Sequence, residues 1–244
     1  MKAYGRTDKG IVRRDNQDHY QIECLSGDQI ILCVVCDGMG GAKAGNVASS
    51  LAAEMFIKTL KSQPMTLLDE ELAEDVMADA MMAANRVVHE EAKSNPDYRG
   101  MGTTLVGAVV REQKAHIINV GDSRAYHISK EGIRQITRDH SFVEDMIQRG
   151  DITREEALHH PNRNLVTQVV GTEPRVTRDM FEIELQAGDR LLFCSDGLTN
   201  LVTDEEILQE LETYEDLDKC CEMLITLALA KGGTDNVTNL IVQV

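Results

Sequence analysis

The sequence of 244 residues predicts an α+β fold in which helices cover the outer faces of antiparallel sheets. Short runs of β-branched and apolar residues, bounded by Gly, Asp or Asn, are typical of buried strands. Three longer segments repeat apolar residues at helical spacing. Strands and helices do not alternate strictly, and neighbouring strands follow one another through tight turns. That order favours antiparallel over parallel pairing.

The predicted strands are short apolar runs. They cover residues 30–36, 104–110, 117–120, 124–128, 191–194 and 237–244. Cys33 and Cys36 form a C-x-x-C pattern within the first run, but positions three apart on a strand face opposite sides and cannot share one metal ion. We therefore interpret all six cysteines as small buried hydrophobic residues.

Three helices are predicted from their apolar faces. The first covers residues 44–60, with an apolar side formed by Val47, Leu51, Met55 and Leu60. The second covers residues 69–93, with Leu72, Val76, Ala80, Ala84 and Val87 on one face. The third covers residues 216–231, with a stripe formed by Leu217, Cys220, Cys221, Leu224, Leu227 and Ala228. Gly232 and Gly233 then end this helix.

Residues 140–171 are predicted to form a flap on the surface. This segment is polar, carries Pro161 and has only weak helical periodicity. A long segment without regular structure in a compact domain is commonly a functional excursion.

The chain is strongly acidic, with a formal net charge of −16. Such a charge argues against a broad nucleic-acid interface and against binding to anionic membranes. The N-terminus lacks the apolar core of a signal peptide, and no apolar run approaches the length of a membrane span. We therefore expect one domain over residues 1–244, in a cytoplasmic, monomeric protein.

Five aspartates stand at the ends of apolar elements. They are Asp18, Asp37, Asp122, Asp196 and Asp235. A single Asp-Gly pair is usually only a turn, but carboxylates gathered at sheet ends repel one another unless cations neutralise them. Mg²⁺ and Mn²⁺ prefer oxygen ligands of this kind. The set of five therefore predicts a divalent metal centre.

Other chemistries fit the residues less well. The glycine-rich residues 37–45 open a helix but match neither the P-loop nor the dinucleotide-binding pattern. Cys36 and Cys194 lack the arginine that would follow the nucleophile of a cysteine phosphatase. Neither H-E-x-x-H nor an EF-hand loop occurs.

Seven motifs occur in one order along nearly the whole chain. They are R-x-x-N-Q-D at 13–18, D-G-M-G-G at 37–41, M-G-T-T at 101–104, G-D-S-R at 121–124, T-R-D-H-S at 137–141, S-D-G-L at 195–198 and G-x-x-D-N-x-T at 232–238. In these motifs the chain resembles the PPM family, the type-2C metal-dependent protein phosphatases, in its compact bacterial form.

The resemblance implies an α-β-β-α sandwich, two antiparallel sheets flanked by helices with a metal cleft at one edge. It implies that Asp37 bridges two ions and that the Gly38 carbonyl, Asp196 and Asp235 complete the core ligands. It further implies that Asp18 holds a metal directly or through water. A third ion is expected at Asp122 and Asp196, and the substrate phosphate at Arg13.

The resemblance also implies a reaction and partners. Phosphoserine or phosphothreonine in a protein is hydrolysed when a hydroxide bridging two Mn²⁺ or Mg²⁺ ions attacks phosphorus. Family members of this size commonly oppose a serine/threonine kinase. Many eukaryotic members carry a histidine, a candidate general acid, after Asp-Gly. Met39 stands there in this chain and cannot donate a proton. Substrate selectivity is expected in the flap at 140–171.

Two other functions remain open from the sequence. One is a phosphatase dedicated to a single regulatory protein, such as a sigma-factor antagonist, with low activity on generic phosphopeptides. The other is a pseudophosphatase that only binds partners, which the retained aspartates disfavour.

Several further residues have alternative interpretations. Thr103 and Thr104 either begin a strand or support the metal ligands. Arg124 and Asp139 form an ordinary ion pair in the simplest interpretation, and His140 is expected to be a structural hydrogen-bonding residue.

Overall fold

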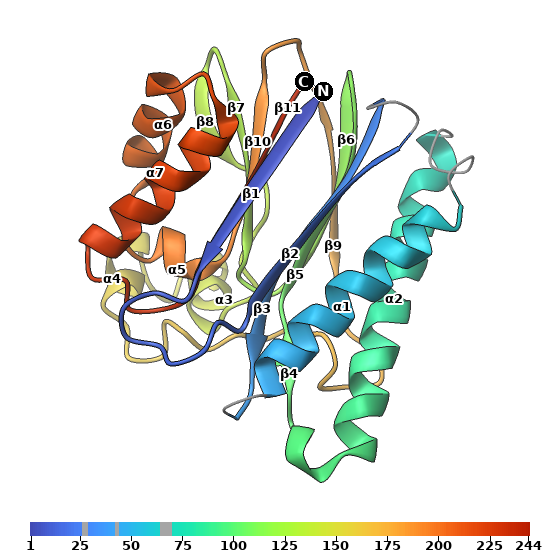
Figure 1. The fold of residues 1–244 in the computed structure, drawn as a ribbon. Coiled ribbons are helices and arrows are strands. Elements are labelled where there is room, and N and C mark those ends of the chain that lie inside the picture. The colour runs from blue at the N-terminus through green and yellow to red at the C-terminus, as the bar shows by residue number, and fades with distance from the viewer. Residues whose placement is uncertain (26–28, 42–43, 64–69) are drawn as a thin grey trace.

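The computed structural model describes residues 1–25, 29–41, 44–63 and 70–244 as two antiparallel sheets packed face to face (Figure 1). The predicted residues 42–43 and 69 lie outside the described residues. The first sheet has the order β1 (Lys2–Asp8), β11 (Val237–Gln243), β10 (Arg190–Cys194), β7 (Arg124–Ser129) and β8 (Gly132–Gln135). The second has the order β2 (Asp18–Leu25), β3 (Ile30–Met39), β5 (Leu105–Arg111), β6 (Lys114–Val120) and β9 (Asp179–Glu184), with β4 (Gly102–Thr103) paired to β3.

Helices cover the outer face of each sheet. The helices α1 (Ala44–Lys61) and α2 (Glu70–Ser94) pack on the second sheet, and the 3₁₀ turn η2 (Pro96–Tyr98) follows them. The helices α5 (Asp196–Thr199), α6 (Asp204–Thr213) and α7 (Leu217–Ala230) pack on the first sheet. The four layers confirm the predicted α-β-β-α sandwich (Figure 1).

The central strand β3 feeds two hydrophobic cores because its side chains alternate between the two faces of the sheet. Ile31, Cys33 and Val35 enter the core between the sheets. Ile30, Leu32, Val34 and Cys36 enter the core beneath α1 and α2. A strand buried on both faces has an unbroken apolar sequence. Cys33 and Cys36 lie in different cores, so they face opposite sides of the sheet as predicted.

One cysteine prediction is wrong. Five of the six cysteines are buried, but Cys24 is exposed near the end of the edge strand β2. An edge strand has one solvated side, so a small apolar residue there need not be covered.

The apolar faces of α1 and α2 differ in part from the prediction. The closest face of α1 carries Ala48, Ala52 and Phe56, all fully buried, while Val47, Leu51 and Met55 pack at its margin. Small side chains allow the helix axis to approach the sheet, and a Cβ on Gly107 of β5 would lie 2.7 Å from the Phe56 ring. On α2, Leu72 is 44% exposed, while Met77, Met81 and Val88 are buried.

The helix α7 follows its predicted stripe closely. Its N-cap Asp216 accepts hydrogen bonds from the backbone N–H groups of Asp218 and Lys219. The chain then leaves the helix through Gly232 and Gly233, which have φ angles of 121° and 49°. Glycine adopts these angles without the strain that a Cβ would cause, which confirms the predicted stop.

Four strands of at least four residues have no counterpart in the prediction, and all four are edge strands. They are β1 and β8 in the first sheet and β2 and β9 in the second. Most of their side chains are partly or fully exposed. Mixed polar sequences of this kind lack the apolar signal by which central strands are recognised.

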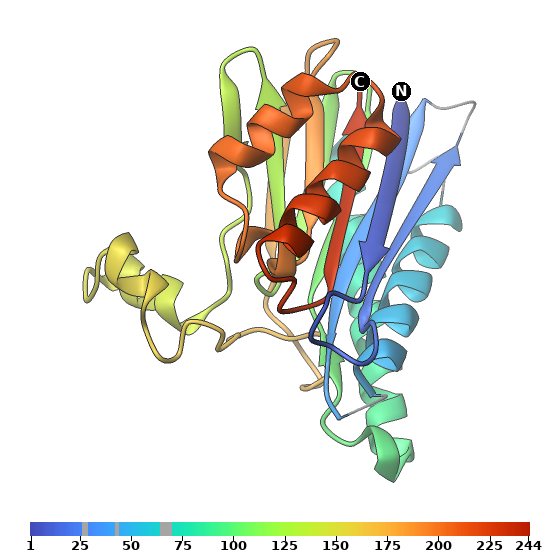
Figure 2. The same ribbon diagram turned by 60° about the vertical axis from the view of Figure 1, so that its left-hand side comes forward.

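The predicted flap projects away from the sandwich (Figure 2). It contains two short helices, α3 (Phe142–Arg149) and α4 (Arg154–Leu158), in place of the weak helical pattern expected there. Local capping explains α4, because the Thr153 hydroxyl accepts from the Glu156 N–H and the Glu156 carboxylate accepts from the Thr153 N–H. The flap starts and ends at the edge of the sandwich that carries the predicted ligands.

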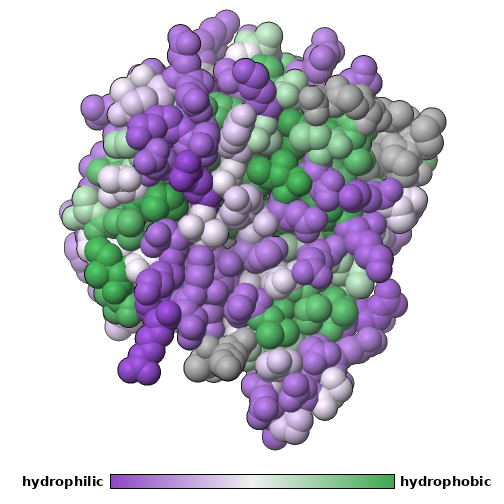
Figure 3. Space-filling view, in the orientation of Figure 1, coloured by the Kyte–Doolittle hydropathy of each residue, from purple (hydrophilic) through white to green (hydrophobic). Residues whose placement is uncertain are grey.

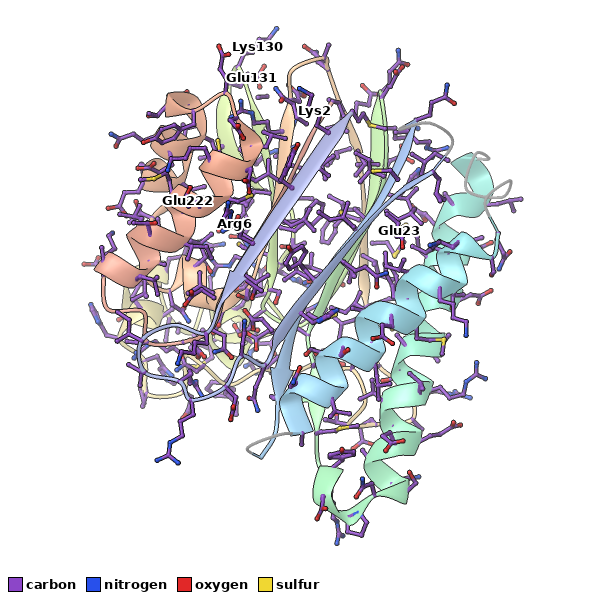
Figure 4. The ribbon with its side chains drawn as sticks, viewed as in Figure 1. Lys2, Arg6, Glu23, Lys130, Glu131 and Glu222 are labelled. Carbon is purple, nitrogen blue, oxygen red and sulfur yellow. The ribbon has the colours of Figure 1, made fainter. Side chains whose placement is uncertain are left out.

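Ion pairs join the edge strands to the helices. The Arg6 guanidinium on β1 donates to both carboxylate oxygens of Asp218 on α7, at 2.8 and 2.9 Å, and Glu222 lies nearby (Figure 4). Lys61 of α1 pairs with Glu23 of β2 at 2.9 Å. Hydrophilic residues cover much of this face, and hydrophobic residues form separate patches between them (Figure 3). Among the described helices, none is both long and apolar enough to cross a membrane.

Candidate metal centre

The five predicted aspartates gather at one edge of the sandwich. Asp37 lies near the end of β3, Asp122 follows β6, Asp196 begins α5 after β10, and Asp235 precedes β11. Each therefore stands where a buried strand reaches solvent. Asp37 interacts electrostatically with each of the other four, of which Asp18 has the largest effect.

The backbone of Asp37 is held by two threonine hydroxyls. The Asp37 N–H donates to Thr104 Oγ1 at 2.9 Å, and Thr103 Oγ1 donates to the Asp37 carbonyl at 2.9 Å. The Thr104 hydroxyl also contacts Ser123 Oγ at 2.7 Å, next to Asp122. Thr103 thus belongs to a strand and, with Thr104, supports a predicted ligand, so both interpretations hold.

Gly38 is required by the close approach of α1. A Cβ at this position would lie 2.1 Å from the Gly45 carbonyl oxygen and 2.6 Å from the Gln17 carbonyl oxygen. The Gly38 N–H donates to the same Gln17 oxygen at 3.1 Å. The first turn of α1 therefore rests directly on the backbone that carries Asp37, and any larger residue would push the two apart.

Asp18 is buried, with one oxygen satisfied and the other not. Its Oδ2 accepts from Ser195 Oγ and Thr238 Oγ1, both at 2.7 Å. Its Oδ1 is buried and has no hydrogen-bond partner within the part of the chain that the structure describes. A buried carboxylate oxygen without a donor is costly unless a cation or water occupies that side.

Asp196 has the same division of its two oxygens. Asn200, the residue directly after α5, donates to Asp196 Oδ2 at 2.9 Å, while Asp196 Oδ1 is buried without a hydrogen-bond partner among the described residues. Asp235 accepts from Arg13 Nη2 at 2.6 Å and from the Asn236 backbone N–H at 2.8 Å. Arg13 is half-exposed and reaches into the aspartate group from the loop between β1 and β2.

Asp122 lies in a turn that the flap also contacts. Gly121 has a φ of 106°, and its N–H donates to His140 Nδ1 at 3.2 Å. Because Nδ1 accepts, Nε2 carries the ring hydrogen, and it lies 3.3 Å from Asp179 Oδ2. His140 thus makes the kind of hydrogen bond expected of a structural residue. Arg124 pairs with both oxygens of Asp139, at 2.9 and 2.7 Å, which confirms the ion pair.

Carboxylates this close together are difficult to ionise. Burial raises the pKa of Asp18 to about 7 and of Asp122 to about 8, with the neighbouring charge of Asp196 adding to both. Burial and the neighbouring aspartates also raise the pKa of Asp37 well above its usual range, and that of Asp196. At neutral pH such a group is stabilised by cations that offset the repulsion.

The residues fit a pair of divalent cations. All the side-chain ligand atoms are hard oxygens, and no described residue donates a hydrogen bond to the buried Asp18 Oδ1 or Asp196 Oδ1. Within the described residues, no three of these aspartates place ligand atoms within 4.8 Å of one another. A pair of ions would not need such a compact set, because each ion would take its own share of the ligands.

One other group of possible ligands lies elsewhere, on α2, β6 and β9. Glu74, His116 and Glu182 place three ligand atoms within 4.8 Å of one another. Arg111 Nη2 lies 2.8 Å from His116 Nε2 and can only donate, so His116 Nδ1 carries the ring hydrogen. Lys114 pairs with Glu182 at 3.1 Å. We interpret this group as an ion-paired hydrogen-bond cluster, because no lone pair on His116 is open to a metal.

Sequence reasoning assigned no role to the hydroxyls that hold Asp18. Ser195 and Thr238 lie within recognised motifs, but their contact with Asp18 depends on strands of two different sheets. The Thr7 hydroxyl in turn lies 2.7 Å from the Thr238 hydroxyl, but Thr7 stands in an edge strand and belongs to none of the motifs. Only the alternation of side chains along β1 could have indicated which way the Thr7 side chain points.

Comparisons with known proteins agree with this geometry. The protein phosphatase 2C family matches residues 10–231. The serine/threonine phosphatase stp of Listeria monocytogenes is 38% identical over 243 residues, covering all of this chain and 96% of that protein. The crystal structure of the serine/threonine phosphatase Stp1 from Staphylococcus aureus superposes with a TM-score of 0.93 at 40% identity, covering 100% of this chain and 94% of that one.

A further solved structure contains metal ions. The catalytic domain of the serine/threonine protein phosphatase PstP in complex with two manganese ions has a TM-score of 0.85 to this chain at 34% identity, over 98% of this chain and 96% of that one. Both the family match and the relatives cover nearly the full length. The chain therefore belongs to the protein phosphatase 2C family.

Proposed function

We propose that this protein is a metal-dependent phosphatase that releases phosphate from phosphoserine and phosphothreonine in proteins. The observation that carries the proposal is a pair of buried oxygens, Asp18 Oδ1 and Asp196 Oδ1, that no described residue hydrogen-bonds. They lie within a group of aspartates whose pKa values are raised. The relatives named as serine/threonine phosphatases, and the PstP structure with two manganese ions, support the same conclusion.

Asp37, the Gly38 carbonyl, Asp196 and Asp235 would hold two Mn²⁺ or Mg²⁺ ions. Asp18 would contribute its Oδ1, directly or through water, because Oδ2 is already satisfied. A third ion would lie between Asp122 and Asp196, whose charges already interact. When bound, the ions supply positive charge to the phosphoryl group and activate water as a nucleophile.

Arg13 would orient the substrate phosphate. Its guanidinium presents a planar set of donors, is half-exposed and contacts Asp235 at 2.6 Å, so it stands at the edge of the metal centre. A phosphate oxygen could pair with Arg13 while the other oxygens face the cations. Met39 carries no acidic proton, so we assign no protein side chain as the donor to the leaving group.

The partners follow from charge and from chemistry. The net charge of −16 supports protein substrates over nucleic acids or anionic membranes. The substrates would be phosphorylated by a serine/threonine kinase that this enzyme opposes. We further propose that the chain acts as a single catalytic domain, as a monomer, in the cytoplasm.

The test is phosphate release from a phosphothreonine peptide, with Mn²⁺ and then with excess chelator. Release that requires Mn²⁺ and is restored by Mg²⁺ or Mn²⁺ after chelation is the expected result. Absence of release by folded protein that binds Mn²⁺ would favour an enzyme dedicated to one regulatory protein. Equal release with and without chelator would contradict the proposal.

A further inference from the structure

We propose that a directional chain of hydrogen bonds from Asn16 through Thr7 and Thr238 orients Asp18 for metal binding. This inference rests on the proposed function, because it assigns positioning residues to the same metal centre. It makes Thr7, an exposed residue of an edge strand, a determinant of metal affinity.

The hydrogen-bond chain consists of three short contacts. Asn16 Nδ2 donates to Thr7 Oγ1 at 2.8 Å, the hydroxyls of Thr7 and Thr238 lie 2.7 Å apart, and Thr238 Oγ1 donates to Asp18 Oδ2 at 2.7 Å. Thr7 and Thr238 are direct partners in the β1–β11 register. Asp18 lies on β2 in the other sheet, so the chain crosses between the sheets at the metal-binding edge.

The direction of every bond follows when Asp18 is ionised, which is the state that a metal ligand must have. A carboxylate can only accept hydrogen bonds, so Thr238 donates its one hydroxyl hydrogen to Asp18 Oδ2. Thr238 must then accept from Thr7, whose own hydrogen is thereby used. Thr7 in turn accepts from the amide of Asn16. The amide orientation is fixed independently, because Asn16 Oδ1 accepts from the Asp18 backbone N–H at 3.1 Å.

A second hydroxyl supports the same orientation. Ser195 Oγ donates to Asp18 Oδ2 at 2.7 Å and accepts from the Thr238 N–H at 3.0 Å. Ser195 and Thr238 are both fully buried, and Asp18 is 5% exposed. Two donors therefore converge on Oδ2 and leave only Oδ1 for the metal centre. Bonds aligned in one direction polarise and strengthen one another.

The hydrogen-bond chain also connects the metal centre to the loop that carries Arg13, the residue proposed to bind phosphate. Asn16 lies three residues after Arg13, in the loop between β1 and β2. The Asn236 side chain holds this loop, because it donates to the carbonyls of Lys9 and Asp15 at 2.8 and 3.0 Å. A displacement of Asn16 would therefore act on Asp18 in two ways, directly at its backbone N–H and through Thr7 and Thr238 at its carboxylate.

The test is the affinity of the full chain for Mn²⁺, measured by calorimetric titration after chelation. Thr7→Val keeps the shape of the side chain but neither accepts from Asn16 nor donates to Thr238. We expect it to weaken Mn²⁺ binding by about 2- to 10-fold, the value of one ordinary hydrogen bond. Thr238→Val, which removes a donor to a charged group, should weaken it by about 10- to 100-fold.

Two comparison variants separate positioning from folding. Thr7→Ser keeps the hydroxyl and should restore the affinity. Thr226→Val removes a hydroxyl that only bonds the Glu222 carbonyl of its own helix, and should bind Mn²⁺ like the natural protein. Thr7→Val should unfold cooperatively in chelator, at most a few degrees below Thr226→Val, because hydrogen bonds of this kind are individually weak. Phosphate release by Thr7→Val should regain the natural rate when Mn²⁺ is saturating.

The outcomes distinguish this inference from the proposed function. If the natural protein binds Mn²⁺ and releases phosphate, but Thr7→Val binds Mn²⁺ equally tightly, the hydrogen-bond chain does not position Asp18. The same conclusion follows if Thr7→Ser is as weak as Thr7→Val. If the natural protein itself neither binds Mn²⁺ nor releases phosphate, the proposed function fails and the inference fails with it.

Discussion

Asp18 on β2 and Asp37 on β3 are direct partners in an antiparallel ladder, so their side chains stand on the same face of the sheet. Opposed residues in such a ladder have Cβ atoms about 5 Å apart, and like charges there are destabilising. The fold therefore places two carboxylates in a position that favours a shared cation and disfavours the metal-free, fully ionised state.

The free energy of unfolding of the metal-free protein, measured in excess chelator, should fall as pH rises. Burial raises the pKa of Asp18 to about 7 and of Asp122 to about 8, far above the usual aspartate range. Between about pH 4 and about pH 8 the folded state thus holds more protons than the unfolded state, and the free energy of unfolding decreases with pH. Each group contributes a slope of up to about 1.4 kcal/mol per pH unit.

Thermal unfolding in chelator, followed from about pH 5 to about pH 8, measures this slope. Saturating Mn²⁺ should flatten or reverse it, because the ions bind the ionised carboxylates. A metal-free protein that becomes more stable as pH rises through this range would contradict the raised pKa values.

Replacing Asp37 should separate activity from stability. Asp37→Asn removes the proposed shared ligand, so we expect phosphate release to fall by about 100-fold or more. The same change removes a carboxyl group whose ionisation is opposed by burial and by Asp18, so in chelator the variant should unfold at a higher temperature than the natural protein. Asp218→Asn, which breaks a partly exposed ion pair with Arg6, is the matched control and should retain activity. Near-normal release by Asp37→Asn would exclude Asp37 as a metal ligand.

Arg13 should act on substrate binding and catalysis without affecting the fold. Its side chain is half-exposed and pairs with Asp235 at the edge of the metal centre. Arg13→Ala removes a charged hydrogen bond to phosphate, so kcat/KM should fall by about 10- to 100-fold. Arg14→Ala changes the same charge at the neighbouring exposed position and should have a much smaller effect. Equal losses in the two variants would indicate a general effect of loop charge.

Gly38 and Gly41, both in the D-G-M-G-G motif at residues 37–41, should respond differently to replacement by alanine. A Cβ at Gly38 would lie 2.1 Å from the Gly45 carbonyl oxygen, whereas a Cβ at Gly41 would meet no atom of the described residues within 4 Å. Gly38→Ala should therefore destabilise the protein by about 1–3 kcal/mol and weaken Mn²⁺ binding, because α1 must shift away from Asp37. Gly41→Ala should leave stability nearly unchanged. Denaturant unfolding compares the two, and equal stabilities would contradict the close packing of α1.

The sequence by itself determined the central strands, the helix α7 and the set of candidate ligands. These features are local: an apolar run marks a strand buried on both faces, and an aspartate directly after the run marks where the strand reaches solvent. The dependence on local sequence also explains why four strands were not predicted. The edge strands β1, β2, β8 and β9 carry mixed residues, because one side of each faces water.

Only the tertiary structure decided how the candidate ligands are presented. Asp18 and Asp37 become partners through the β2–β3 register, and the two hydroxyls on Asp18 Oδ2 come from Ser195 and Thr238, far along the chain. The role of Thr7 depends on its pairing with Thr238, 231 residues away. Contacts of this kind are set by which strands lie side by side, and no pattern of neighbouring residues in the sequence records them.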